Sequence, residues 1–314
     1  MLEIRAYNST SGAYTAYQVQ GVASDTKGDG AGTAWWANFG SNQLSRLSTS
    51  NSQVSVWEIP GATSLYSTAI DSSGDVWVSD YFDSFIYQLD PVTNQLCSYT
   101  LPDSGISEYL YNNGQQLWFG DSANGRIVRL QNGTYTWWTL PATSDPRDLE
   151  LDVSGKLWWT DAYLGYLGRL DPTAGEIATF TPPASGTPVM LKLSNGKVWY
   201  SQQSPSGVVM LDPAIATSVT TSVTTGSQAA APTCSELLPL APTTVTANSG
   251  QASWTGQTYA TALDTAGWKV YAMPPNGIPW GINATNQIWL VDQGRQMLAK
   301  LTPSYPSYLP LVQK

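Results

Sequence analysis

The sequence predicts an all-β chain, a seven-bladed β-propeller of four-stranded antiparallel blades, and two observations carry this prediction. First, tryptophan-bearing segments recur about every 41 residues, a period typical of propeller blades. Second, each repeat contains four short apolar stretches separated by turn-forming residues. One such unit cannot bury both faces of its sheet, so several copies must stack face to face to form a core.

The tryptophan segments read TAWWANF, GDVWVSD, QQLWFGD, GKLWWTD, GKVWYSQ, QASWTGQ and NQIWLVD. We count seven copies, one around each of Trp36, Trp77, Trp118, Trp158, Trp199, Trp254 and Trp289. A second strand follows each tryptophan and often ends in Leu-Asp-Pro, because proline cannot donate to a sheet ladder. A third strand carries an aromatic residue three positions before a proline, as in Trp57 and Pro60. A shorter fourth strand leads into the next copy.

The two ends of the chain are expected to meet. The last copy ends near Lys300–Pro303 without an outer strand, whereas residues 1–20 match the outer part of a repeat. We therefore predict that Ala13–Gln20 pairs with the last blade near Met297–Leu301 and closes the propeller. On this interpretation residues 1–314 form a single domain.

A Ser/Thr/Ala-rich insertion spans about residues 214–250. Its flanks, SVTTSV and TTVTANS, are expected to form the outer strand of blade five and the inner strand of blade six. Cys234 lies in this insertion and Cys97 on the outer strand of blade two. Because these blades are well apart in a seven-bladed ring, a disulfide between the two cysteines is disfavoured.

Composition excludes several classes of partner. The chain has 14 Lys and Arg against 23 Asp and Glu, a net charge of −9, and no basic run. This balance argues against nucleic acid and anionic membranes as partners. No apolar stretch is long enough to span a bilayer.

Three features favour an extracellular, cell-surface or virion-surface location. Charged residues are only 12% of the chain, and lysine is scarce. Three Asn-x-Ser/Thr triplets are candidate glycosylation sites, at Asn8, Asn132 and Asn283. Because carboxylates are few and histidine is absent, we also expect the fold to tolerate acid.

Acidic and amide side chains occupy the third position after the key tryptophan in every copy, counted from Trp35 in the first. In a propeller these side chains lie at the start of one family of loops, so four aspartates could bind a divalent cation such as Mg²⁺ or Ca²⁺, or a basic ligand: Asp80, Asp121, Asp161 and Asp292. The favoured alternative is that each one caps its own turn by accepting backbone N–H groups. We expect no other cofactor.

The chain contains no histidine, which removes the commonest general base and the usual zinc ligands. Glu150 lies on an expected inner strand near the central channel. Aromatic residues outside the repeat register are the candidates for ligand stacking: Trp268, Trp280 and Tyr163. Arg129 and Arg169 share one repeat position, where we expect ion pairs with the aspartates.

The repeat resembles the streptogramin B lyase (virginiamycin B lyase) family, and residues 155–183, GKLWWTDAYLGYLGRLDPTAGEIATFTPP, carry the resemblance best. It covers residues 30–213 well and 250–303 more loosely. The resemblance implies a seven-bladed propeller, and in family members Mg²⁺ and a histidine open a cyclic depsipeptide. Here Trp280 stands where the family motif has its histidine, so the lyase activity is not expected.

Two functions remain open. The first is a non-catalytic extracellular or virion-surface module with a structural or recognition role, binding other protein subunits or surface glycans, within a larger assembly. The alternative is a divalent-metal lyase or lactonase that uses carboxylates at the channel mouth.

Overall fold

The computed structural model confirms an all-β chain with a β-propeller fold. It describes residues 2–7, 13–19, 21–29, 32–183, 185–236, 242–253, 261–265, 267–272, 279–284, 288–292 and 297–301. Within these residues the only helical element is the short 3₁₀ turn η1 (Pro102–Ser104). The described part of the chain thus offers no helix of the length and apolarity needed to cross a membrane.

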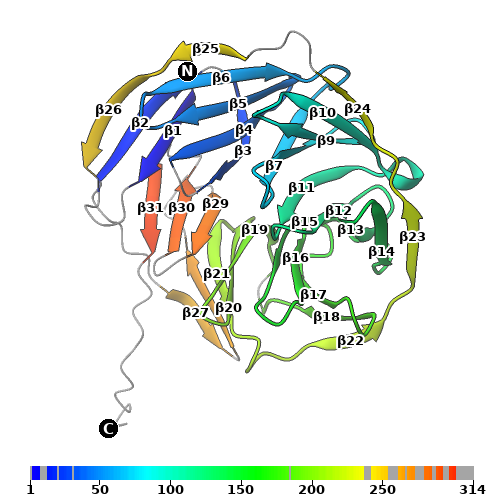
Figure 1. Ribbon diagram of the computed structural model, residues 1–314. Helices are drawn as coiled ribbons and strands as arrows, with labels where there is room; N and C mark the ends of the chain where they lie inside the picture. The colour runs from blue at the N-terminus through cyan, green and yellow to red at the C-terminus, as the bar shows by residue number, and fades with distance from the viewer. Residues whose placement is uncertain are drawn as a thin grey trace. The chain divides into compact units, whose positions relative to one another are not determined.

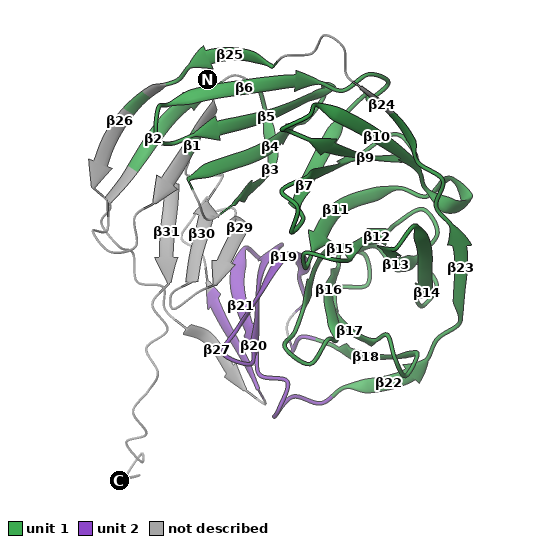
Figure 2. Ribbon diagram, viewed as in Figure 1, with its two compact units in different colours: residues 1–181, 218–254 green, residues 182–217, 255–314 purple. Residues whose placement is uncertain are grey.

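The chain divides into two compact units (Figure 2). Unit 1 contains residues 1–181 and 218–254, and unit 2 contains residues 182–217 and 255–314.

Unit 1 holds four five-stranded blades, each built from four consecutive antiparallel strands and one strand from residues 219–246. Blade 1 is β3 (Ala23–Gly28), β4 (Thr33–Asn38), β5 (Gln43–Ser48), β6 (Gln53–Glu58) and β25 (Thr243–Thr246). Blade 2 is β7 (Leu65–Ile70), β8 (Val76–Asp80), β9 (Phe85–Asp90), β10 (Gln95–Thr100) and β24 (Thr233–Glu236). Blade 3 is β11 (Ser107–Asn112), β12 (Leu117–Asp121), β13 (Arg126–Gln131), β14 (Thr134–Thr139) and β23 (Thr225–Ala229). Blade 4 is β15 (Pro146–Leu151), β16 (Leu157–Asp161), β17 (Leu167–Asp171), β18 (Glu176–Phe180) and β22 (Val219–Ser222).

A three-stranded N-terminal sheet completes unit 1, and it is made of β1 (Leu2–Tyr7), β2 (Ala13–Val19) and β26 (Asn248–Ser253). Unit 2 holds blade 5, with strand order β19 (Thr187–Ser194), β20 (Lys197–Gln203), β21 (Gly207–Leu211), β28 (Trp268–Ala272) and β27 (Thr261–Thr265). It also holds a three-stranded C-terminal sheet of β29 (Pro279–Ala284), β30 (Ile288–Asp292) and β31 (Met297–Leu301).

The predicted count of seven blades is therefore wrong, whereas the four consecutive antiparallel strands expected of each blade are present in blades 1 to 4, with a fifth strand added. The described residues form five full blades, and each has five strands. The count failed around Trp254, because the strand that precedes it, β26, pairs with β2 instead of starting a blade of its own. The predicted pairing of Ala13–Gln20 with Met297–Leu301 is also wrong, since both edges of β2 are occupied, one by β1 and the other by β26.

The insertion is a belt along the outer edges of unit 1 (Figure 1). Its strands β22 to β26 pair in turn with the outermost strands of blades 4, 3, 2 and 1 and then of the N-terminal sheet. The belt thus runs opposite to the order in which the blades were laid down. Its Ser/Thr-rich residues suit this place, because β22 and β25 are fully exposed. The predicted roles of SVTTSV in blade five and of TTVTANS in blade six are corrected accordingly.

A disulfide joins the belt to blade 2. Cys97 of β10 and Cys234 of β24 face each other in the ladder, and their sulfur atoms are bonded across a sequence separation of 137 residues. The expectation against this bond was wrong because it placed the belt on blade five.

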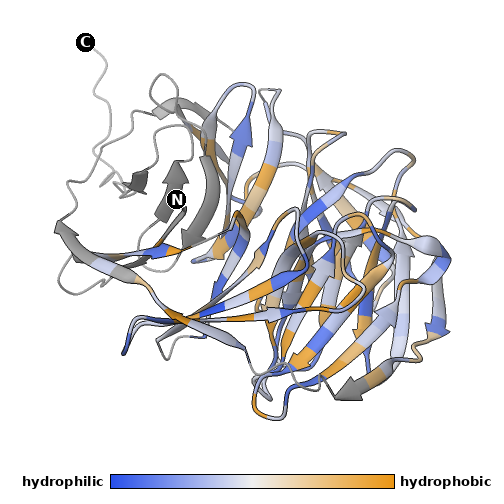
Figure 3. Cartoon of the chain, turned by 90° about the horizontal axis from the view of Figure 1, so that it is seen from above, coloured by the Kyte–Doolittle hydropathy of each residue, from blue (hydrophilic) through white to orange (hydrophobic). Residues whose placement is uncertain are grey.

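The blades of unit 1 pack face to face through apolar side chains, and Figure 3 shows apolar positions along their strands. Trp35, Leu44 and Trp57 of blade 1 meet Val78 and Tyr87 of blade 2. A second cluster joins blade 2 to blade 3, and a third joins blade 1 to the N-terminal sheet. Burial between sheets, at roughly 25 cal/mol per Å² of apolar area, is what stabilises a stack of blades that could not fold singly.

Turn chemistry matches the hairpins. Asn132 and Gly133 join β13 to β14, and both have positive φ angles, of 49° and 67°. Asn195 and Gly196 repeat the arrangement between β19 and β20. Asn-Gly is the pair that favours the tight hairpin turn with two left-handed residues, because its twist matches that of the strands.

Blades 1, 3 and 4 each carry an arginine layer, in which a guanidinium lies over two aromatic rings. In blade 1 the guanidinium of Arg46 lies 5.4 Å from the ring of Trp35 and 5.3 Å from that of Trp57. Blades 3 and 4 repeat this layer with Arg129 between Trp118 and Trp138, and with Arg169 between Trp158 and Phe180. The ion pairs expected for Arg129 and Arg169 are replaced by these cation–π contacts, which are electrostatically favourable in a partly desolvated layer.

Candidate functional site

The inner strands of blades 1 to 4 share an irregularity that gathers polar side chains. In each of β3, β7, β11 and β15 the register with the next strand shifts after the first residue, which marks a β-bulge. Bulges turn side chains away from the regular alternation and are common next to functional sites. The residues at the shifts, here called the bulge cluster, are Ser24–Asp25, Tyr66–Ser67, Glu108–Tyr109 and Arg147–Asp148.

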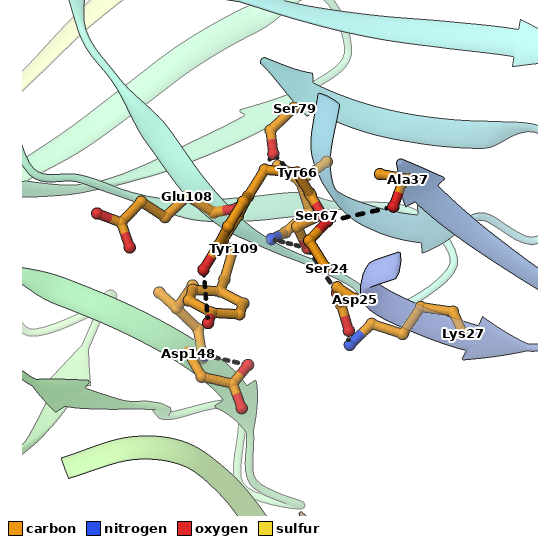
Figure 4. Close-up of polar contacts among 12 residues, drawn as sticks. Ser24, Asp25, Lys27, Ala37, Tyr66, Ser67, Ser79, Glu108, Tyr109 and Asp148 are labelled. Carbon is orange, nitrogen blue, oxygen red and sulfur yellow. Dashed lines mark hydrogen bonds and ion pairs between the residues drawn. The ribbon is translucent and has the colours of Figure 1, made fainter. Parts of the chain in front are cut away.

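Hydrogen bonds connect the bulge cluster from one blade to the next (Figure 4). The Ser67 hydroxyl donates to Asp25 Oδ2 at 2.7 Å and accepts the backbone N–H of Leu110 at 3.0 Å. The Ser24 hydroxyl donates to the Tyr66 carbonyl. Each of these bonds crosses from one inner strand to its neighbour, so the cluster holds blades 1, 2 and 3 in fixed register.

Two buried tyrosines extend the network. The hydroxyls of Tyr66 and Tyr109 lie 3.1 Å apart in a mutual hydrogen bond. Burial raises the pKa of Tyr66 and raises that of Tyr109 further. Both phenols are therefore neutral at physiological pH, and neither is a base.

Charged residues border the network on two sides. On the side of Asp25, Lys27 Nζ lies 3.3 Å from Asp25 Oδ2. Burial disfavours the ammonium, but Asp25, Asp148 and Glu150 outweigh burial and raise the pKa of Lys27. Lys27 thus remains charged.

On the side of Glu108, Arg147 bridges two carboxylates. Its Nη1 lies 3.3 Å from Glu108 Oε2, and its Nη2 lies 3.2 Å from Asp145 Oδ2. Burial raises the pKa of Glu108, and the nearby Arg147 only partly opposes this. The Glu108 carboxylate in turn raises the pKa of Tyr81, with burial as the second cause.

Aromatic side chains gather near Glu108, and the outer ones are exposed to solvent. Phe39 packs edge-on against Tyr66 at 5.7 Å and against Tyr81 at 5.8 Å, and Tyr81 packs against Phe82 at 4.9 Å. Phe39 is 39% exposed and Phe82 is 64% exposed, whereas Tyr109 at the base is buried. We call Phe39, Tyr66, Tyr81, Phe82 and Tyr109 the aromatic mouth.

The chemistry of this region favours a cation with an apolar stem. Two cationic side chains, Lys27 and Arg147, are set among five carboxylates, those of Asp25, Asp145, Asp148, Glu108 and Glu150. Aromatic faces attract cations through their quadrupoles, and a nearby excess of carboxylates adds to that attraction. The mouth therefore suits a lysine or arginine side chain better than an anion.

The aspartates that could have bound a divalent cation are engaged elsewhere. Asp80 accepts the N–H groups of Thr63, Ser64 and Phe82, so it ties the start of the inner strand to its own turn. Equivalent bonds hold Asp121, which also pairs with Arg126, and Asp161, which binds the N–H groups of Asp145 and Leu164. Among the described residues no three acidic or cysteine side chains converge to hold a metal. Asp80, Asp121 and Asp161 thus hold their own turns, whereas Asp292 has its side chain outside the described residues.

The other predicted site residues are scattered. Trp268 is buried in blade 5 against Tyr200, whereas Tyr163 is 72% exposed on the loop after Asp161. Glu150 lies close enough to Lys27 to raise its pKa, so it belongs to the charged border of the bulge cluster. Trp280 lies on β29 with its side chain outside the described residues.

Of the glycosylation triplets, Asn132 lies on the exposed turn between β13 and β14. Asn8 and the side chain of Asn283 lie outside the described residues.

The sequence analysis missed the bulge cluster and the aromatic mouth. The available signal was in the repeat. The packing positions keep the same residue types from blade to blade, whereas one inner-strand position changes its side chain in each blade: Asp25, Ser67, Tyr109 and Asp148.

Comparison with known structures gives the fold family in outline. A catalytically inactive variant of virginiamycin B lyase from Staphylococcus aureus, solved with quinupristin, is 16% identical, with a TM-score of 0.70 over 95% of this chain and 87% of that chain. Selenomethionine-substituted virginiamycin B lyase from the same organism gives 0.64 at 16% identity, over 95% and 90%. A streptogramin B lyase gives 0.50 at 16% identity, over 92% and 97%. No family model and no curated protein matches the sequence. At this identity the likeness shows a streptogramin B lyase-like β-propeller fold and nothing of the chemistry.

Proposed function

We propose that this chain is a non-catalytic recognition module of an extracellular or virion surface, and that its aromatic mouth binds a protein segment through a cationic side chain. The observation that carries the proposal is the edge-on packing of Phe39, Tyr81 and Phe82, together with the Glu108 carboxylate that raises the pKa of Tyr81. Most of the binding energy of a protein interface comes from a few residues, and these are often aromatic side chains clustered in an exposed apolar patch.

The location rests on separate support. The Cys97–Cys234 disulfide is typical of oxidising compartments, and the exposed Asn132 triplet is a glycosylation signal of secreted proteins.

Selection from a random peptide library tests the binding. We expect enriched peptides to share a lysine or arginine next to an apolar residue. Phe82→Ser should weaken binding of a selected peptide about thirtyfold, because an anchoring aromatic residue contributes about 2 kcal/mol. The side chain is mostly exposed, so the fold should survive the change.

Val153→Ser is the matched control. Val153 is a fully exposed apolar residue on the β15–β16 turn, at the opposite end of the strands from the aromatic mouth. The Val153→Ser protein should bind the selected peptide with the same affinity as the unchanged protein. Selection of peptides without a basic residue, or equal binding by Phe82→Ser, would refute the proposal.

We propose no lyase or lactonase activity. The support is the absence of histidine from the sequence, with Trp280 at the motif position, and the engagement of Asp80, Asp121 and Asp161 in turns. Incubation with quinupristin and Mg²⁺, followed by mass spectrometry, tests this directly. Linearised quinupristin formed at a rate above the protein-free control would contradict it.

A further inference from the structure

Blade 2 departs from the arginine layer of its neighbours. Gln88 occupies the position of Arg46, Arg129 and Arg169, opposite Trp77 in the ladder, as those arginines lie opposite their own tryptophans. The Gln88 side chain is shorter than that of arginine, and two hydrogen bonds within blade 2 fix its amide. Its Nε2 donates to Asp75 Oδ2 at 2.8 Å, and its Oε1 accepts the Tyr99 hydroxyl at 2.9 Å.

A cavity of about 210 Å³ lies at this place, between blades 2 and 3 and at the opposite end of the strands from the aromatic mouth. Trp77, Gln88 and Tyr99 line it from blade 2, Gln131 and Asn132 line it from blade 3, and Pro232 of the belt contributes a further wall. Pockets for drug-sized ligands measure about 300–1,000 Å³, so this one suits a single small ring.

The lining mixes apolar and polar groups. The described residues around the cavity include no lysine or arginine. The carboxylate that does line it, Asp71, already accepts Trp77 Nε1 at 2.9 Å through one oxygen, and the N–H groups of Ser73 and Asp75 through the other. The lining thus offers an anion no cationic side chain, and its one carboxylate is already hydrogen-bonded within the protein.

What the cavity does offer is amides and aromatic rings. The carboxamides of Gln131 and Asn132 carry donors and acceptors, which match the paired roles of sugar hydroxyls, and Gln88 has a second N–H besides the one it donates to Asp75. Trp77 and Tyr99 lie with ring centroids 5.1 Å apart and supply apolar surface for the C–H groups of a sugar ring.

We propose that this cavity, opened by the exchange of arginine for Gln88, binds one neutral sugar residue. The sugar has two sources: a free or partner glycan, or a glycan attached to Asn132 on the rim of the cavity itself. The site is separate from the aromatic mouth and does not depend on it.

Unglycosylated protein tests the first source by saturation-transfer NMR and calorimetry with glucose, galactose, mannose, N-acetylglucosamine and the anionic sugar glucuronate. We expect at least one neutral sugar to bind at least tenfold more tightly than glucuronate. Gln88→Arg restores the residue found in three sister blades, so it should fold, fill the cavity and weaken sugar binding more than tenfold. Arg169→Gln, the reverse exchange in blade 4, and Phe82→Ser in the aromatic mouth should leave sugar binding unchanged.

Protein from a host that performs N-glycosylation tests the second source. A glycan at Asn132 that occupies the cavity should raise the thermal midpoint above that of Thr134→Ala, which destroys the attachment triplet, and this gain should vanish in Gln88→Arg. A positive result in either arm supports the proposal. Absence of neutral-sugar binding together with no such gain, or binding retained in Gln88→Arg, would overturn it.

Discussion

Removal of the Cys97–Cys234 disulfide should be the most costly change to this fold that leaves every packing contact in place. The double replacement Cys97→Ser and Cys234→Ser releases a loop of 137 residues in the unfolded chain. In the chain-entropy treatment a loop of this length corresponds to about 17 cal/mol/K, or about 5 kcal/mol at 25 °C. At about 2 °C per kcal/mol for a chain of this size, the melting temperature should fall by about 10 °C.

Two measurements check the size and the place of this loss. Guanidinium unfolding followed by circular dichroism gives the free energy for both proteins, with and without reductant. Hydrogen exchange with mass spectrometry should show faster exchange at β23, β24 and β25, because the disulfide fixes the middle of the belt. The inner strands of the blades should exchange at nearly unchanged rates.

Reductant provides the internal control. It should lower the stability of the unchanged protein to that of the double variant and have no effect on the variant itself. Two titratable thiols in the unchanged protein, unfolded without reductant, would refute the reasoning. So would equal unfolding midpoints for the two proteins.

Three further predictions concern the blades and the bulge cluster. Burial raises the pKa of Glu108, so the folded state binds the Glu108 proton more tightly than the unfolded chain does. The resulting stabilisation is fully present below the unfolded pKa, near 4.5, and is lost as pH rises through the higher folded pKa. Unfolding free energy should therefore increase from pH 7 to pH 5, and Glu108→Gln should flatten the increase, as pH-dependent denaturant titrations would show. Arg129→Gln removes two cation–π contacts and should cost about 1–2 kcal/mol in the same titrations, with an unchanged value counting against a stabilising arginine layer. Gly168→Ala brings a Cβ within 2.0 Å of the buried Trp159 ring and should cost about 1–3 kcal/mol, whereas Gly28→Ala, with only an ordinary contact at 3.7 Å, should cost much less.

The repeat predicted the first four blades well, because their tryptophan strands combine a fixed period with turn residues that any reader of the sequence can see. It failed where pairing depends on which sheet edge is free. The segment before Trp254 has the composition of a blade strand, yet β26 joins β2 at the edge of the N-terminal sheet. Strand composition indicates a half-buried surface and does not specify a partner.

The belt could not be predicted for the same reason. Its Ser/Thr-rich strands were recognised as strands, but each one adds to a blade laid down much earlier in the chain. The period of the repeat predicts which strands pair with their neighbours along the chain. The Cys97–Cys234 pair depends on a strand pair that is distant along the chain, β10 with β24.

The candidate site was found only at its margins. Glu150 was singled out for its place on an expected inner strand, and it borders the bulge cluster through Lys27. Tyr163, chosen because it stands off the repeat pattern, lies on the loop between β16 and β17. The bulges that gather Asp25, Tyr66 and Glu108 leave no signature in a single sequence, since a register shift of one residue depends on the geometry of the paired strand.

The path of the belt also dictates an order of assembly. Residues 219–253 can pair only with strands that already exist, so the blades of unit 1 must form before the belt docks on them. During synthesis those blades emerge from the ribosome first and spend that interval with bare outer edges. Such edges are templates for pairing between chains. The newly made protein is thus most prone to aggregate shortly before its last third is translated, and chains truncated before residue 219 should stay in that vulnerable state.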